Sequence, residues 1–327
     1  MTREGGPAGA ADAGRAAGLR PFVDAATQLL LEAGVASPRH DALALAAHVL
    51  GRDRVDLVLP PELPADFASR FAELVERRRR REPLQHLVGS TGFRYLTLAV
   101  EPGVFVPRPE TEVVAGVAVE EAARVAAGGT EPVVVDLCCG SGAIAVAVAT
   151  EVPTARVTGV DLSEQAVALT TRNGAAARAE HLVALHGDVA DPALLSGLAG
   201  RVHVLVANPP YIPPDAEPVD PEVRDHDPDL ALYGGGADGL DVPRAVLRAG
   251  GRLLVPGGLL VMEHAEVQAE AARDAATATG WYQDVRTQDD LTGRPRMLVA
   301  RRTGRPGPPG VADPDERRRP DVGDSRP

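Results

Sequence analysis

Between residues 132 and 302 the chain alternates short apolar runs with patterns of helical period. The apolar runs are rich in Val, Leu and Ala and predict seven strands, at residues 132–137, 155–161, 182–187, 202–207, 258–263, 284–288 and 296–300. Helices are expected to begin near Gly142, Ser163, Pro192, Asp241 and Glu266. Strands that alternate with helices in this way predict an α/β fold with a mostly parallel, doubly wound sheet.

Residues 19–84 show helical spacing only and predict a small helical domain of three helices. The first, residues 22–34, ends at Gly34 and has one apolar side, formed by Phe22, Ala25, Leu29 and Leu30. The second begins at Pro38 behind a cap by Ser37 and ends at Gly51. Its apolar stripe consists of Ala42, Leu45, Ala46 and Leu50. The third spans residues 65–79 and turns inward Phe67, Phe71, Leu74 and Val75.

The pattern changes at residues 85–108, which predict a linker built on a β-hairpin. Residues 91–95 and 96–100 are expected to form its two strands. Two prolines then flank Arg108, and a helix with acidic residues in its first turn begins near Glu110. A charged cluster in so stiff a loop suggests a structured position, and a helix entry with a surface ion pair is the alternative interpretation. The α/β domain follows at residues 109–302, while residues 1–18 and 303–327 have the composition of disordered ends.

The charge balance bears on possible partners. The 327 residues carry a formal net charge of −12, and each of the 34 basic residues is Arg, which excludes chemistry based on Lys. An acidic chain is a poor candidate for sequence-independent binding to duplex DNA, which depends on neutralising phosphates. The run of arginines at residues 77–81 is interpreted as a solvated helix end, with a patch for RNA or an acidic partner as the alternative.

No apolar run reaches the roughly 18 residues of a membrane span, and residues 1–20 lack the apolar core of a secretory signal. We therefore expect a cytoplasmic protein without a membrane partner. The two cysteines, Cys138 and Cys139, are neighbours in the sequence. Their Cα atoms, about 3.8 Å apart, are too close for an ordinary disulfide, and they have no further ligands at zinc spacing. Two packed thiols and no metal are expected.

The most distinctive stretch follows residues 202–207 and consists of Asn208, Pro209, Pro210 and Tyr211. Neither proline can donate to a sheet, and the proline after Asn208 keeps that residue extended. The result is a rigid corner just beyond a strand end, where ligands bind in open α/β sheets. The Asn208 side-chain carbonyl, the proline carbonyls and the Tyr211 ring would suit a planar NH2 group. An ordinary turn is the alternative interpretation.

A second candidate site consists of a glycine loop between a strand and a helix, formed by Cys138, Cys139, Gly140, Ser141 and Gly142. It resembles the S-adenosylmethionine-binding pattern acid-x-Gly-x-Gly-x-Gly, with Asp136 as the acid and Cys138 in place of the first glycine. Asp161 ends the next strand, about 20 residues beyond the loop, where a carboxylate can hold ribose hydroxyls. Asp188 and Val189 follow the third strand, where an acid can accept from an adenine amine. Each Asp could instead cap a helix, but the three together predict a cofactor site.

Together these stretches resemble the protein N5-glutamine methyltransferases that modify class-1 peptide chain release factors, the PrmC/HemK family. The resemblance runs from residue 22 to residue 302. Besides the two candidate sites, it is carried by Ser37-Pro38-Arg39, Glu82-Pro83-Leu84-Gln85-His86, Pro107-Arg108-Pro109-Glu110-Thr111-Glu112, Pro221-Glu222-Val223-Arg224, Leu230-Ala231-Leu232-Tyr233, Gly234-Gly235-Gly236-Ala237-Asp238-Gly239-Leu240-Asp241 and Asp290-Leu291-Thr292-Gly293-Arg294. One departure is Ala265, where the family usually has a glycine after the residue pair Glu263-His264.

The resemblance implies a seven-stranded, Rossmann-like methyltransferase domain that depends on S-adenosylmethionine and follows a helical substrate-recognition domain and a hairpin linker. It implies a cofactor site lined by Cys138, Cys139, Gly140, Ser141, Gly142, Asp161, Asp188, Val189 and Asn208. The glutamine of the release factor would be bound by Asn208, Pro209, Pro210 and Tyr211. Of these, the catalytic residues would be Asn208, Pro209 and Tyr211. We hypothesise that the Asn208 side-chain oxygen and the Pro209 carbonyl accept both amide N–H bonds and orient the nitrogen toward the methyl group.

Three alternatives remain open at this point. An adenine-N6 methyltransferase of DNA or RNA could use the same corner, although the acidic balance and the lack of a separate basic domain argue against it. A glutamine methyltransferase of a ribosomal protein would have the same active site and would differ in the helical domain. A non-enzymatic scaffold that binds S-adenosylmethionine would have no use for a corner that binds an amine.

Overall fold

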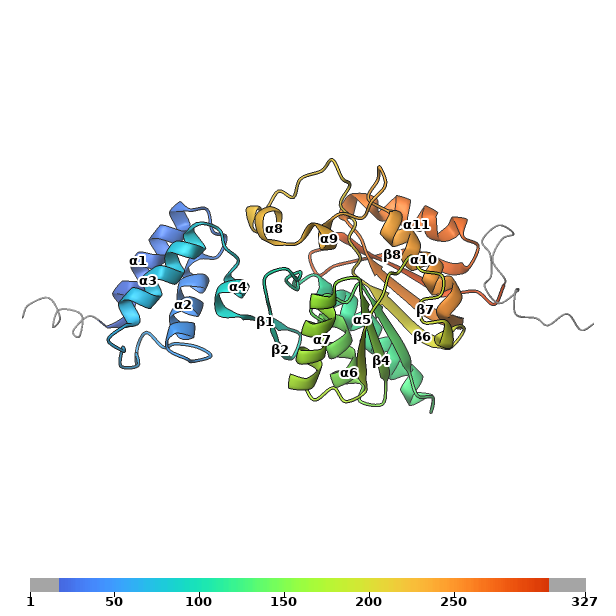
Figure 1. Ribbon diagram of the computed structural model, residues 1–327, viewed down its shortest axis with the longest axis horizontal. Coiled ribbons are helices and arrows are strands. Elements are labelled where there is room, and N and C mark those ends of the chain that lie inside the picture. The colour runs from blue at the N-terminus through green and yellow to red at the C-terminus, as the bar shows by residue number, and fades with distance from the viewer. Residues whose placement is uncertain (1–17, 306–327) are drawn as a thin grey trace, which may run out of the picture. The chain divides into compact units, whose positions relative to one another are not determined.

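The computed structural model of the protein describes residues 18–305 (Figure 1). Contacts divide the chain into two units, which are described separately. The first comprises the described residues through Ser90 together with Pro218–His226, and the second comprises Thr91–Glu217 and the chain from Asp227 onward. The disorder expected at both ends falls mainly on residues 1–17 and 306–327, which lie outside the described residues. Between residues 18 and 305, no helix has both the length and the apolar character needed to cross a membrane.

The first unit contains α1 (Leu19–Glu32), α2 (Pro38–Val49) and α3 (Phe67–Arg79), which confirm the three predicted helices. A fourth short helix, α4 (Leu84–Val88), was not predicted. The helices bury a single apolar core in which the Phe67 ring stacks on Phe71 and meets Phe22 edge-on, at centroid distances of 5.3 and 5.4 Å. Aromatic pairs of this kind add to the stabilisation that burial provides.

Two details of the helical prediction are wrong. Helix α1 begins at Leu19, and its buried stripe continues from there as Val23, Ala26 and Leu30. The predicted stripe was rotated by one position, so that Leu29, expected inside, is 45% exposed. Ser37 does precede α2, but its side chain makes no capping hydrogen bond, and only its backbone carbonyl accepts from the helix. The predicted end at Gly34 is confirmed by its positive φ of 72°.

The run of arginines at the end of α3 is not uniformly solvated, which corrects its interpretation as an exposed helix end. Arg78 is only 4% exposed and donates to Asp41 of α2 and to Glu222, each at 2.7 Å. Glu222 belongs to α8 (Pro221–His226), so this pair holds α8 within the first unit. The remaining arginines of the run also have acidic neighbours, which are Glu76, Glu82, Asp220 and Glu222.

In the second unit, β1 (Ser90–Phe93) and β2 (Leu96–Ala99) confirm the hairpin. The seven predicted strands are also confirmed, as β3 (Val133–Leu137), β4 (Arg156–Asp161), β5 (Leu182–His186), β6 (Val202–Ala207), β7 (Leu254–Glu263), β8 (Tyr282–Asp289) and β9 (Pro295–Arg302). They form one sheet in the order β5-β4-β3-β6-β7-β9-β8. The first five of these are parallel, and β9 runs antiparallel to both of its neighbours. The mostly parallel sheet is therefore confirmed.

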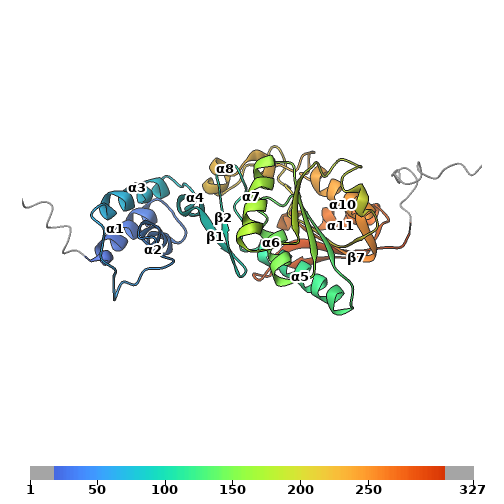
Figure 2. The same cartoon turned by 60° about the horizontal axis from the view of Figure 1, so that its bottom comes forward.

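Helices cover both faces of the sheet (Figure 1 and Figure 2). Alternate strand residues point to opposite faces. Thus Val134 and Val204 share a core with α5 (Thr111–Ala127) and α6 (Ala143–Glu151). On the other face, Val135 and Leu205 share a core with α10 (Asp241–Leu253) and α11 (Ala269–Ala278). Apolar side chains on both faces explain why the strand sequences read as continuous apolar runs.

The helix expected near Pro192 is wrong. The chain there forms turns and the short 3-10 helix η1 (Ser196–Leu198). Asp191 accepts from the backbone N–H of Ala193, and Leu195 has a positive φ of 53°, so the helical path is interrupted. Two short helices, α8 and α9 (Asp229–Leu232), were not predicted, whereas α7 (Glu164–Ala176) begins after Ser163 as expected.

The buried Arg78 gives a stability prediction. Replacing it by Ala leaves the Asp41 carboxylate buried without its partner, and we expect the first unit to lose about 3–5 kcal/mol of unfolding free energy. Urea unfolding followed by far-UV circular dichroism measures this loss. The single tryptophan, Trp281, lies in the second unit. Its fluorescence transition should therefore move much less.

The matched control for this prediction is Arg80→Ala, because the Arg80 side chain is 73% exposed and pairs only with Glu76. Such a surface pair contributes at most about 1 kcal/mol. Equal losses in the Arg78 and Arg80 variants would contradict the structural role assigned to the buried arginine.

Candidate active site

The two stretches singled out in the sequence lie side by side at one edge of the sheet. Strands β3 and β6 pair in parallel, with Leu137 opposite Ala207. Cys138 and Asn208 therefore follow neighbouring strands at the same level. The strand order reverses at this point, because β4 lies on the far side of β3 and β7 on the far side of β6. Such a switch point is where open α/β sheets bind ligands.

Asp136, in β3, binds the first turn of the helix that follows the glycine loop. It is 1% exposed, and its Oδ2 accepts from the backbone N–H of Ala145 in the first turn of α6 at 3.0 Å. Its other oxygen, Oδ1, is buried and has no hydrogen-bond partner among the described residues. Burial raises the pKa of Asp136 to about 8. The site thus contains one buried oxygen that could form a hydrogen bond with a ligand.

Asp161, at the end of β4, binds the loop from the side. Its Oδ2 accepts from the backbone N–H of Gly140 at 2.8 Å, and its Oδ1 accepts from the backbone N–H of Ser163 at 2.9 Å. Burial raises the pKa of this carboxyl group. The structure therefore brings Asp161 and the glycine loop together, and the carboxylate still has lone pairs for a further donor.

Two residues that the sequence analysis missed hold the loop from α7. The Thr170 hydroxyl donates to the carbonyl of Gly140 at 3.0 Å. The Asn173 side chain donates to the carbonyl of Ser141 at 2.9 Å and exchanges two hydrogen bonds with the backbone of Ala99. Both are buried on the face of α7 that also carries Ala166 and Leu169. Polar residues at helical spacing on an otherwise apolar stripe were the available signal.

Gly140 and Gly142 of the loop differ in the space around their Cα atoms. Gly142 has a φ of 81°, and a Cβ there would lie 2.8 Å from Thr170, so the fold itself requires it. Gly140 has a φ of 56°, but a Cβ there would meet nothing within 4 Å. The loop therefore has open space beside Gly140, into which a ligand could fit.

Cys138 and Cys139 are free thiols in different environments. Cys138 has a φ of 61°, in the left-handed region that favours glycine. Cys139 is buried, its backbone N–H bonds to the carbonyl of Val160, and its sulfur lies 3.5 Å from the Thr170 hydroxyl. Burial raises the pKa of both thiols, so neither is a thiolate at neutral pH.

Asp188 and Val189 follow β5, the next strand outward. Because β5 pairs with β4 and β4 with β3, the three acids Asp136, Asp161 and Asp188 follow the order of adjacent strands. Asp188 is exposed, and its Oδ1 accepts from the backbone N–H of Ala190 at 2.8 Å. It thus caps a turn. Its second oxygen makes no hydrogen bond within residues 18–305.

Asn208 lies half-buried directly after β6. Its Nδ2 donates to the hydroxyl of Thr111, the first residue of α5, at 3.4 Å. The Thr111 hydroxyl in turn donates to Oε2 of Glu263, the last residue of β7, at 2.8 Å. Burial raises the pKa of Glu263 to about 7. The sequence places Thr111 and Glu263 in separate motifs and gives no local signal of their contact with Asn208.

Behind the corner, the chain is packed closely by a second glycine-rich loop. A Cβ at Gly239 would lie 2.2 Å from the carbonyl oxygen of Tyr211, which only glycine allows. Gln268 donates to the same Tyr211 carbonyl at 2.7 Å and to the carbonyl of Asp238 at 2.9 Å. Within residues 18–305, by contrast, no hydrogen bond ends on the carbonyl oxygen of Pro209. That oxygen is thus available to a ligand.

The stiff loop around Arg108 is tied into the same region. Arg108 forms an ion pair with Asp227, which is buried, and its guanidinium lies 5.0 Å from the centre of the Phe105 ring. The ion pair is therefore half-buried rather than on the surface. Charges on Arg108 and Arg296 act on the Tyr211 hydroxyl, but burial is the largest influence and raises the pKa of Tyr211, so the phenol keeps its proton.

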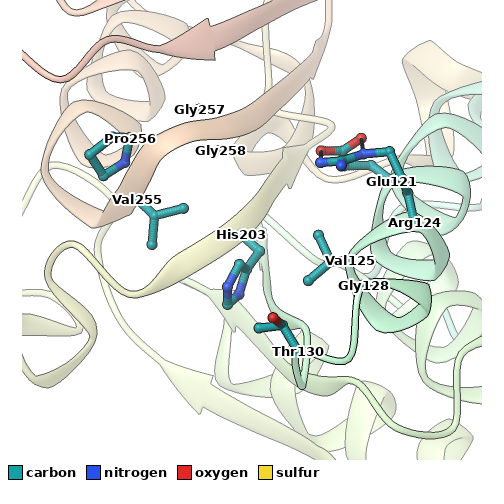
Figure 3. Close-up of a pocket in the computed structure, with 10 residues that line it drawn as sticks. All are labelled: Glu121, Arg124, Val125, Gly128, Thr130, His203, Val255, Pro256, Gly257 and Gly258. Atoms are coloured by element: carbon teal, nitrogen blue, oxygen red, sulfur yellow. Dashed lines mark hydrogen bonds and ion pairs between the residues drawn. The ribbon is translucent and has the colours of Figure 1, made fainter.

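A pocket of about 350 Å³ elsewhere in the second unit is not this site (Figure 3). It is lined by α5 and the residues after it, by the start of β7 and by His203 near the start of β6, so it lies at the opposite strand end from Asn208. Burial alone would raise the pKa of Glu121 there, but hydrogen bonds from Arg124 and Arg301 hold it at about 2. His203 accepts from the backbone N–H of Val133. These polar groups are engaged in structural bonds.

The chain is similar to known proteins over most of its length. Two family models match, the PrmC N-terminal domain over residues 22–89 and the Methyltransferase small domain over residues 99–219. The release factor glutamine methyltransferase of Streptomyces coelicolor is 49% identical over 278 residues, which cover 85% of this chain and 95% of that protein. The protein of the same name from Mycobacterium tuberculosis is 43% identical, covering 92% and 98%. Among solved structures, a methyltransferase from Pyrococcus furiosus covers 69% of this chain and 99% of its own, at 14% identity and a TM-score of 0.48.

The strained position of Cys138 gives a testable prediction. A left-handed backbone costs a non-glycine residue roughly 1–2 kcal/mol, and the greater chain entropy of glycine offsets about 0.5–1 kcal/mol of this. Cys138→Gly should therefore raise the unfolding free energy of the second unit by about 0.5–1 kcal/mol. Denaturant unfolding followed by Trp281 fluorescence measures it. Cys139→Gly is the matched control and should destabilise, because that thiol is buried against Thr170. A loss in both variants would argue against strain at Cys138.

Proposed function

Since this chain belongs to the family of release factor glutamine methyltransferases, we propose that it transfers a methyl group from S-adenosylmethionine to the side-chain amide nitrogen of a glutamine in a class-1 peptide chain release factor. The observation that carries this proposal is the pairing of β3 with β6, which sets the Asn208 corner beside the glycine loop. An acceptor site for a planar amide and a candidate cofactor loop therefore share one edge of the sheet.

The residues of the loop fit the cofactor. The open space beside Gly140 admits a ligand to the backbone, and the unpartnered oxygen of Asp136 can form a hydrogen bond with it. Carboxylates of Asp161 and Asp188 can bind hydroxyl and amine groups. We assign the binding of S-adenosylmethionine to Cys138, Cys139, Gly140, Ser141, Gly142, Asp161, Asp188, Val189 and Asn208. When bound, it would supply a methyl group on a positively charged sulfonium: the N–CH3 bond would form as the S–CH3 bond breaks, the sulfur would leave as a neutral thioether, and the methylated nitrogen would release one N–H proton to water.

The protein's task is to orient a poor nucleophile. The lone pair of an amide nitrogen is delocalised into its carbonyl group. The rate therefore depends on the orientation of the nitrogen and on the polar groups around it. The side-chain oxygen of Asn208 and the carbonyl oxygen of Pro209 would accept the two amide N–H bonds and fix the plane of the glutamine side chain. Orientation of this kind can lower a barrier by up to about 7–11 kcal/mol. The same oxygens bind more strongly as the nitrogen gains positive charge, which stabilises the transition state.

Pro210 and Tyr211 complete the amide site. Pro210 prolongs the stiff extended corner, and its fixed φ restricts the movement of the Asn208 and Pro209 oxygens. The Tyr211 ring offers a flat surface against which a planar amide can lie. Its hydroxyl stays protonated and therefore does not compete with the amide as a nucleophile for the methyl group. The helical region, for which we propose the boundaries 19–84, would recognise the release factor together with the linker at residues 85–108.

The substrate is tested by methyl transfer from labelled S-adenosylmethionine. Release factor, ribosomal proteins and duplex DNA are incubated separately with the enzyme, and the labelled product is digested and sequenced by mass spectrometry. The proposal expects label on one glutamine of the release factor. Label confined to a ribosomal protein would indicate the related glutamine activity, and label on adenine would indicate a nucleic-acid methyltransferase; either result would overturn the proposed substrate.

The role of Asn208 is tested by Asn208→Ala. Loss of an acceptor that acts mainly in the transition state should lower kcat by about 100- to 1,000-fold, while S-adenosylmethionine still binds in a calorimetric titration through the other residues assigned to its site. Asn173→Ala, at the chain's other asparagine, is the control: it releases the glycine loop and should weaken cofactor binding instead. Near-normal methylation by the Asn208 variant would refute the assignment.

A further inference from the structure

Behind the Asn208 corner lies a chain of hydrogen bonds that ends in a buried acid. Asn208 donates from Nδ2 to Thr111 at 3.4 Å, and Thr111 donates to Glu263 at 2.8 Å. Thr111 and Glu263 are 4% and 3% exposed, respectively. They come from different elements, the start of α5 and the end of β7, so the chain exists only in the folded second unit. Neither residue lies in the motifs to which cofactor or amide binding is assigned.

We propose that Thr111 and Glu263 are positioning residues that hold the Asn208 carboxamide with its oxygen toward the substrate amide. The inference rests on the proposed function, because it specifies how the amide acceptor of that site is oriented. A carboxamide has two ends of nearly equal size, an oxygen that accepts and a nitrogen that donates. Only the oxygen can bind the N–H of a glutamine side chain.

The direction of each hydrogen bond follows from counting protons. An ionised Glu263 has no proton and can only accept. The single hydroxyl proton of Thr111 must then point to Glu263, which leaves a lone pair of the hydroxyl for Asn208. That lone pair requires a donor, so the carboxamide of Asn208 must present its NH2 group to Thr111. Its oxygen consequently points to the opposite side, away from the buried acid.

Protonation of Glu263 would remove this constraint. A neutral Glu263 can itself donate to Thr111, and the Thr111 hydroxyl can then donate to the Asn208 oxygen. The carboxamide would turn by half a rotation and present NH2 to the NH2 of the substrate, where two donors face each other and no hydrogen bond forms. The orientation of Asn208 is therefore coupled to the charge on Glu263.

Several charged or titratable groups act on Glu263. Arg296 on β9 favours the ionised form, whereas Glu110 before α5 and Asp290 in the loop between β8 and β9 disfavour it. Tyr211 of the corner also faces it, and His264 follows it in the chain with a pKa that burial lowers. Burial has the largest effect and raises the pKa of Glu263 to about 7. Loss of its proton with rising pH should therefore switch activity on.

The first test is the pH dependence of kcat. The fraction of ionised Glu263 rises about tenfold from pH 6 to pH 8, and wild-type kcat should rise about tenfold over the same interval. Glu263→Gln keeps an oxygen that can accept from Thr111 but cannot titrate, so its kcat should be flat between pH 6 and pH 8. An unchanged pH profile in this variant would overturn the proposal.

The second test removes the hydroxyl without changing the shape of the side chain. Thr111→Val should lower kcat by about 10- to 100-fold with little change in the KM for release factor. Thr111→Ser should recover most of the loss. The control is Thr171→Val, because that hydroxyl bonds only to a carbonyl within its own exposed helix turn. A valine variant with the kcat of the control would contradict the proposed role.

The third test needs neither substrate nor cofactor. The chain contains only two asparagines, Asn173 and Asn208, so labelling with nitrogen-15 asparagine gives two pairs of side-chain NH2 signals. The Asn208→Ala variant assigns them. One Asn208 proton should move upfield in Thr111→Val and also on acidification through pH 7 in the wild type, while the Asn173 signals stay in place. Asn208 signals that respond to neither change would overturn the proposal.

These tests separate the inference from the proposed function. If wild-type protein labels no glutamine, the proposed function fails, and the amide signals still decide whether Thr111 and Glu263 orient Asn208. If wild-type protein labels glutamine but Thr111→Val and Glu263→Gln retain its kcat and pH profile, the positioning role fails while the proposed function stands.

Discussion

The site depends on the parallel pairing of β3 with β6. Each backbone hydrogen bond between these strands fixes their register, and the register brings the residue after Leu137 to the level of the residue after Ala207. A slip by one residue would turn every side chain of a strand to the opposite face and break both cores. The apolar residues on the two faces of the sheet therefore hold the glycine loop and the Asn208 corner side by side.

Buried polar side chains near this edge of the sheet form hydrogen bonds that hold the two loops in place. Asp136 accepts from the first turn of α6, and Thr170 and Asn173 donate to backbone carbonyls of the glycine loop. Thr111 accepts from the Asn208 side chain, and Gln268 donates to the Tyr211 carbonyl behind it. Each of them is buried and makes hydrogen bonds that a shifted backbone would lose. The groups left over are an oxygen of Asp136 and the carbonyl of Pro209, which are available to ligands.

The sequence predicted all seven strands and the two candidate loops, because both rest on local signals: apolar runs, glycines and prolines. It did not predict interactions between distant residues. Arg78 and Glu222 are 144 positions apart, and Thr111 and Glu263 are 152 apart. Neither pair has a local pattern that reveals it. Near Pro192 the helix prediction failed for another reason. The spacing of apolar residues was helical, but the Asp191 side chain accepts from the backbone N–H of Ala193, and Leu195 has a positive φ, so the helical backbone is interrupted.

A crystal structure of the enzyme with a glutamine-containing release factor peptide and S-adenosylhomocysteine would test the amide site most directly. The glutamine amide nitrogen should lie about 2.7–3.2 Å from both the Asn208 side-chain oxygen and the Pro209 carbonyl oxygen, the range of an N–H···O hydrogen bond. The Asn208 side-chain nitrogen should still donate to Thr111. A glutamine bound away from these two oxygens, with Asn208 turned into the core, would contradict the proposed amide site.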